Sequence, residues 1–170
     1  GNAAGPVVDP AARSNLIARS TGAGETGSIL VSGVDVNMVD ALVRVESVSG
    51  AAGVVPGVSV VVPEEFSDDR TVTPSIAIIA TGADSLDILN GLIETTSSGA
   101  ADAGSVLLEV TPAADGGADG TLTAISSTDL DRPVMFSSTT TGGGSAGEFV
   151  WRAFRVAFGD ETGASGTGIG

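Results

Sequence analysis

Short runs of alternating apolar and polar residues recur along the chain from Ser28 onward, separated by Gly, Pro, Asp and Ser. Val43-Arg44-Val45-Glu46 places valines on one face of an extended chain and charges on the other, as on a half-buried strand. Residues 76–80 are apolar throughout, which is typical of a strand that is buried on both faces. This pattern favours a β-sandwich or barrel over alternating strands and helices.

About eight strands are predicted from nine such runs. They cover residues 28–36, 39–48, 54–62, 71–80, 86–96, 105–111, 120–126, 133–139 and 148–158, of which 105–111 and 120–126 are expected to form a hairpin. The run 86–96 is ambiguous, because its leucines also fit helical spacing, and we favour a strand there.

The chain is therefore expected to hold one all-β domain, an antiparallel β-sandwich over residues 28–160. Residues 1–27 are rich in small residues and are interpreted as an extended N-terminal arm. Residues 161–170 are Gly-rich and are interpreted as a flexible C-terminal tail.

The composition argues against an enzyme. The 170 residues include no His, Cys, Tyr or Lys, which removes most of the side chains that act as general acids, bases or nucleophiles near neutral pH. A net charge of −14 repels phosphate backbones, so nucleic-acid binding is not expected either. We therefore expect a structural protein.

The charge is concentrated in the middle of the chain. Residues 64–131 carry thirteen acidic residues and one arginine, whereas the segments on either side are close to neutral. Because burying unpaired carboxylates is costly, we expect the central loops to face solvent and the ends of the chain to make contacts between subunits.

Two groups of residues are candidate sites. Asp115 and Asp119 lie in one predicted loop and offer the oxygen ligands that Ca²⁺ or Mg²⁺ accepts, although a solvated turn explains them as well. No other cofactor is expected. The segment 148–158 contains the only Trp, Trp151, with Arg152 and Arg155. A core strand near the end of the domain explains this segment as well, but we expect these three residues, together with Arg13 and Arg19 of the arm, to contact neighbouring subunits.

The short strands, the arm, the Gly-rich tail and the lysine-free acidic composition resemble those of the small single-jelly-roll major capsid proteins of membrane-containing icosahedral viruses of halophilic archaea. The resemblance covers about residues 28–158 as a pattern, without a diagnostic motif. It implies a single jelly roll in a capsid shell, self-association with a second capsid protein, location in the virion and proximity to an internal viral membrane. An immunoglobulin-like topology fits the pattern equally well.

Other structural roles remain open. A phage tail-tube or head-decoration protein, or an extracellular β-sandwich that forms a fibre or surface layer, would show the same lack of catalytic side chains.

Overall fold

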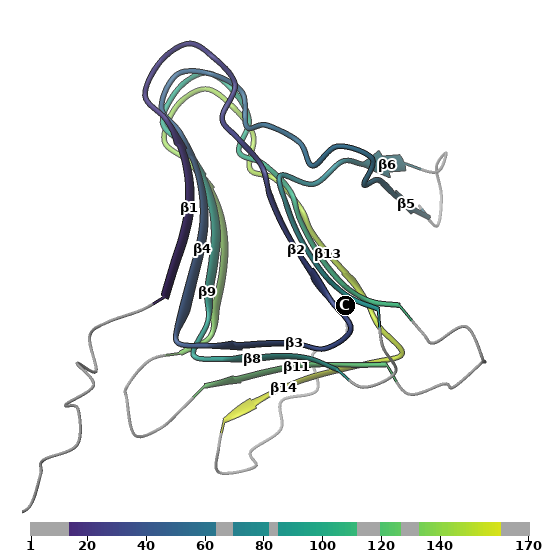
Figure 1. The fold of residues 1–170 in the computed structure, drawn as a ribbon. Helices are drawn as coiled ribbons and strands as arrows, with labels where there is room; N and C mark the ends of the chain where they lie inside the picture. The colour runs from purple at the N-terminus through teal and green to yellow at the C-terminus, as the bar shows by residue number, and fades with distance from the viewer. Residues whose placement is uncertain (1–13, 64–69, 82–84, 112–119, 127–132, 161–170) are drawn as a thin grey trace, which may run out of the picture.

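The chain forms three parallel β-sheets that enclose a triangular interior (Figure 1). The computed structural model describes residues 14–63, 70–81, 85–111, 120–126 and 133–160. Sheet A contains β1 (Ser14–Ser20), β4 (Ala41–Ser47), β9 (Leu92–Ser97) and β12 (Met135–Thr140). Sheet B contains β2 (Ile29–Gly33), β7 (Ile76–Ala80), β10 (Val106–Val110) and β13 (Phe149–Arg152). Sheet C contains β3 (Val36–Val39), β8 (Ser85–Leu89), β11 (Thr121–Ser126) and β14 (Arg155–Asp160).

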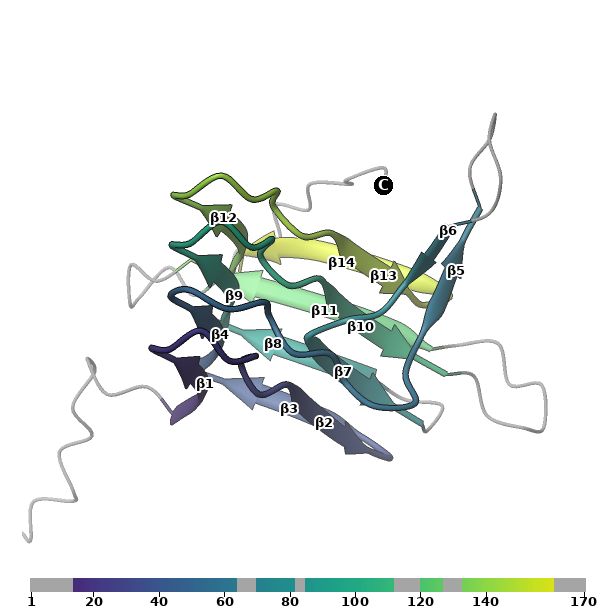
Figure 2. The same cartoon turned by 90° about the horizontal axis from the view of Figure 1, so that it is seen from above.

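The chain runs through sheets A, B and C in turn and then returns to sheet A one strand further along, so it is a parallel β-solenoid. Each circuit is one rung: β1–β3 form rung 1, β4, β7 and β8 form rung 2, β9–β11 form rung 3, and β12–β14 form rung 4. Figure 2 shows the four rungs stacked in chain order. No helix, and hence none that could span a membrane, occurs among the described residues.

The predicted antiparallel sandwich, including its jelly-roll form, is wrong. All nine strand pairings within sheets A, B and C are parallel. The one antiparallel pair among the described residues is formed by β5 (Val60–Val62) and β6 (Arg70–Val72), which are inserted between β4 and β7. Short strands separated by turns are common to both architectures, and the pattern does not specify which strands become neighbours.

Two local predictions also fail for this reason. β10 and β11, the expected hairpin, lie in different sheets, because the chain turns a corner between them. The ambiguous run 86–96 is neither a helix nor one strand; it contains β8 and β9, with a corner at Asn90.

Ser14–Ser20, within the predicted arm, forms β1 and pairs with β4. Residues 1–13 and 161–170 lie outside the described part of the chain.

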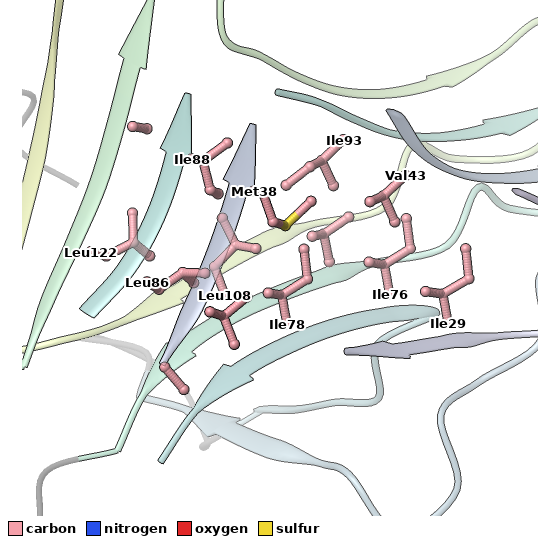
Figure 3. Close-up of a cluster of buried hydrophobic side chains, with 14 of the residues drawn as sticks. Ile29, Met38, Val43, Ile76, Ile78, Leu86, Ile88, Ile93, Leu108 and Leu122 are labelled. Atoms are coloured by element: carbon pink, nitrogen blue, oxygen red, sulfur yellow. The ribbon is translucent and has the colours of Figure 1, made fainter. Parts of the chain in front are cut away.

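The interior is built from columns of apolar side chains that stack from rung to rung. Parallel pairing in register places like positions above one another, so each inward position repeats in every rung. Figure 3 shows inward side chains from the three sheets meeting in this core. The columns of rungs 2 and 3 are fully buried, including Ile76, Ile78, Leu86, Ile93, Leu108 and Leu122.

The corner between sheets C and A is held by a pair of stacked polar residues. Asp40 and Asn90 both have φ in the left-handed region, at 49° and 55°, which short polar residues tolerate better than other non-glycine residues. Asn90 Nδ2 donates a hydrogen bond to Asp40 Oδ1 at 3.3 Å. The backbone amide of Asp40 donates a hydrogen bond to the carbonyl oxygen of Leu89, and that of Asn90 donates one to the carbonyl oxygen of Ile125. Each acceptor lies in the next rung, so these corners stack as regularly as the strands.

The corner between sheets A and B depends on glycine for a different reason. A Cβ on Gly142 would collide with the carbonyl oxygen of Gly99 in the rung below, and one on Gly144 would collide with that of Ala101. Neither glycine has a positive φ, so close contact between stacked backbones, rather than backbone conformation, requires them.

We predict that Gly142→Ala lowers the free energy of unfolding by about 1–3 kcal/mol, because the added methyl group overpacks the contact with Gly99. Gly143→Ala is the matched control, since a Cβ there meets nothing within 4 Å among the described residues. Urea unfolding of the two variants measures the difference, and equal stability of both variants would contradict the stacked-turn geometry.

Candidate functional site

The predicted interface arginines of the strands pair with glutamates of the same chain. Arg19 lies 3.4 Å from Glu46, and Arg152 lies 3.4 Å from Glu109. Arg44, which was not singled out, pairs with Glu94. In each pair the two residues occupy the same register position in adjacent rungs, so these ion pairs support the rung stacking.

The other predicted site residues are placed as follows. The Arg155 guanidinium lies 5.8 Å from the centroid of the Phe154 ring, and Trp151 points into the solenoid interior. Arg13, Asp115 and Asp119 lie outside the described residues, so the Ca²⁺ or Mg²⁺ site stays a prediction. Within the described ranges, no group of three or more acidic residues could hold a metal ion.

Two surface grooves offer little chemistry. One, of about 550 Å³, follows the stacked corner between sheets A and B and includes Asp102 and Glu148. The Asp102 carboxylate accepts a hydrogen bond from the Ser145 amide at 2.6 Å, and Glu148 forms an ion pair with Arg70 at 2.7 Å. The second groove, of about 580 Å³, lies beside sheet B at Val62 and Trp151 and shares the same Arg70–Glu148 pair. Both acidic side chains therefore make structural contacts.

A cluster of four aromatic rings lies in the interior of rung 4, at the end of the apolar columns. Phe136 of β12 lies 6.0 Å from Phe149, 5.7 Å from Trp151 and 6.2 Å from Phe158, measured between ring centroids. Trp151 and Phe158 are 4.8 Å apart. Edge-to-face and tilted contacts at these distances are favourable. All four rings are only partly buried, because rung 3 covers one side of the cluster alone.

Among the described residues, rung 1 leaves the opposite end of the core open. Leu16 points inward below Val43, yet it is 45 % exposed, and an opening of about 190 Å³ lies beside Leu16, Val31 and Met38. Ten large apolar side chains are exposed among the described residues, and eight belong to the end rungs: Leu16, Ile17, Leu30, Val34 and Val39 in rung 1, and Met135, Phe154 and Val156 in rung 4.

The end strands also carry backbone edges without a strand partner among the described residues. β1, β2 and β3 are the first strands of their sheets, and β12, β13 and β14 are the last. Unpaired edges of this kind are templates for pairing with another chain, and solenoids are normally closed by repeats with a polar outer face. The two open ends, rather than the grooves, are therefore the candidate functional surfaces.

Sequence reasoning missed these surfaces because it missed the repeat. Ser97-Ser98-Gly99 recurs as Thr140-Thr141-Gly142, and the paired strands that precede them place both segments at the same register. Ser20-Thr21-Gly22 occupies that position in rung 1. This Ser/Thr-rich glycine motif is the available sequence signal of the stacked corner.

No family model, curated protein or solved structure matches this chain.

We predict that Arg44→Gln lowers the free energy of unfolding by about 1–3 kcal/mol, because it leaves the Glu94 carboxylate, only 14 % exposed, without its ion pair. Arg19→Gln is the control, since Arg19 and Glu46 are more exposed and such pairs contribute about 0–1 kcal/mol. Urea unfolding at low salt measures both changes. A loss at Arg19 as large as that at Arg44 would contradict the ranking by burial.

Proposed function

We propose that this chain is a structural, non-catalytic protein that associates with copies of itself through the ends of its solenoid. The observation that carries the proposal is that the apolar columns and all three sheets run to both ends of the described stack without a polar cap. An extended assembly, such as a fibre or a surface structure, is the natural product of joining such ends.

The size of a rung junction supports the proposal. Rungs 3 and 4 align six residue pairs in sheet A, four in sheet B and six in sheet C. Each backbone hydrogen bond contributes a net of about 0.5–1.5 kcal/mol. A junction of similar extent between two copies, together with burial of the exposed end residues, is therefore large enough to offset the roughly 4–15 kcal/mol cost of association.

The chemistry of the described surface also supports a structural role. Asp102 and Glu148, the acidic residues of the groove at the corner between sheets A and B, are engaged in contacts within the fold. The chain has no His, Cys or Lys to act beside them. An enzyme would need a reactive group that these grooves do not offer.

A role in a fibre or a surface layer is compatible with the solenoid, because it requires end-to-end or lateral association of subunits and does not require a β-sandwich fold. The capsid role was inferred through a jelly roll, and the solenoid lends it no support from the fold. A second capsid protein, a nearby viral membrane and location in the virion stay predictions.

Self-association is expected to increase with protein concentration and with salt, because salt screens the repulsion between copies that each carry a net charge of −14. Sedimentation velocity from low to high salt measures the size distribution. Trp151, the only tryptophan, lies at the open end of rung 4, so its quenching by acrylamide should fall as assemblies grow. A monomer at every concentration and salt level, with unchanged quenching, would contradict the proposal.

A further inference from the structure

The glycines of the rung 1 corner have no structural reason to be glycine within the described chain. The strand registers place Gly22 at the same position as Gly99 and Gly142. A Cβ on Gly99 or Gly142 would collide with backbone of the rung below, at Val48 and Gly99 respectively. A Cβ on Gly22 meets nothing within 4 Å, and Gly22 does not have a positive φ.

Gly24 repeats the observation. Its register counterpart in rung 4 is Gly144, where a Cβ would collide with Ala101 of rung 3, whereas a Cβ on Gly24 meets nothing within 4 Å. In this corner Gly99, Gly142 and Gly144 each face the preceding rung, whereas Gly143 faces open space. Gly22 and Gly24 therefore leave the space that the backbone of another corner would need in order to stack below rung 1.

The corner of rung 4, residues 140–148, is of the required kind. It continues the same register and carries Gly142, Gly143 and Gly144, so its backbone is free of bulky side chains. A second copy whose rung 4 lay below rung 1 would bring the Gly142 carbonyl to Gly22 and the Gly144 carbonyl to Gly24, as Gly99 and Ala101 meet rung 4 within one chain.

The inward columns continue across such a junction. The strand registers align each inward residue of rung 1 with an inward residue of rung 4. Five of these pairs are apolar on both sides: Leu16 with Phe136, Ile29 with Phe149, Val31 with Trp151, Val36 with Val156, and Met38 with Phe158. Ala18 with Ser138 and Ser20 with Thr140 include polar residues. The aromatic rings of rung 4 would be covered by aliphatic side chains of rung 1.

Charge is complementary at the same junction. Val36 and Val156 share a register position, so the residues that precede them, Asp35 and Arg155, share the next one. Both are exposed. Their juxtaposition would repeat the Arg–Glu pairs that link adjacent rungs within the chain, such as Arg152 with Glu109.

We infer that the partner of the rung 1 end is the rung 4 end of a second copy, stacked head to tail in register so that the three sheets continue from one copy into the next. The inference rests on the proposed self-association and specifies its interface and polarity. Such an interface joins two different surfaces, so it does not close on itself as a two-fold dimer does.

Gly22→Val directly tests the contact between Gly22 and the corner of a second copy. In a monomer the added side chain enters open space, so the melting temperature should stay the same, whereas in the stack it would collide with the neighbouring Gly142 carbonyl. We expect sedimentation velocity to detect no assemblies of this variant up to at least ten times the threshold concentration at which the wild type assembles. Gly143→Val is the matched control, because a Cβ there meets nothing within 4 Å among the described residues although rung 3 stacks beneath it, and it should assemble like the wild type.

The outcomes separate the two proposals. If the wild type does not associate, the proposed function fails. If the wild type associates and Gly22→Val associates equally well, or if Gly143→Val is equally defective, the head-to-tail interface is overturned while self-association stands. A lower melting temperature of monomeric Gly22→Val would show that residues of the same chain cover this corner, which also overturns the interface.

A charge exchange tests the polarity. Asp35→Arg and Arg155→Asp should each raise the threshold concentration several-fold, because each places like charges across the junction. An equimolar mixture of the two variants should recover the wild-type threshold, since every junction between unlike variants again pairs opposite charges. Failure of the mixture to assemble better than either variant alone would overturn the assigned register.

Discussion

Backbone pairing along the solenoid axis is the constraint on which the rest of this structure depends. Each rung satisfies the amides and carbonyls of its three strands through the rungs above and below it, and three parallel four-stranded sheets result. A sandwich also has edge strands, but here every strand of a terminal rung is an edge. The described rungs 1 and 4 therefore each present three edges together with the open end of the core, and unpaired edges of this kind can pair with another chain.

Regular stacking explains the unusual composition. Val, Ile and Leu fill the inward columns, and Gly allows stacked corners to approach closely, as Gly142 does over Gly99. Charged residues on the outer faces are used in pairs between rungs, as with Arg44 and Glu94. Inward apolar columns, glycine-rich corners and outward charged residues join one rung to the next within the chain. All three features are present at both ends, and this is why we propose a second copy as the partner.

Many strand-forming segments were predictable from the sequence, but the corners that divide runs such as 86–96 and the partners of the strands were not. The alternation of Val43 and Val45 identifies β4 correctly, because inward and outward residues alternate in a parallel sheet as they do in an antiparallel one. Pairing was hidden because the rungs differ in length. Sheet A partners lie 27 residues apart between β1 and β4, 50 between β4 and β9, and 43 between β9 and β12, so no fixed period appears in the sequence. The sequence predicts Trp151 in a core strand or on a contact surface, but its place among rings from three sheets depends on that pairing and was not predictable.

X-ray fibre diffraction combined with electron cryomicroscopy of the assembled protein at high salt tests the central claim most directly. If copies stack in register, strands continue through each junction at a spacing of about 4.8 Å, and four rungs give an axial rise of about 19 Å per copy. Closed shells, two-fold end-to-end dimers or a rise unrelated to four rungs would contradict the account.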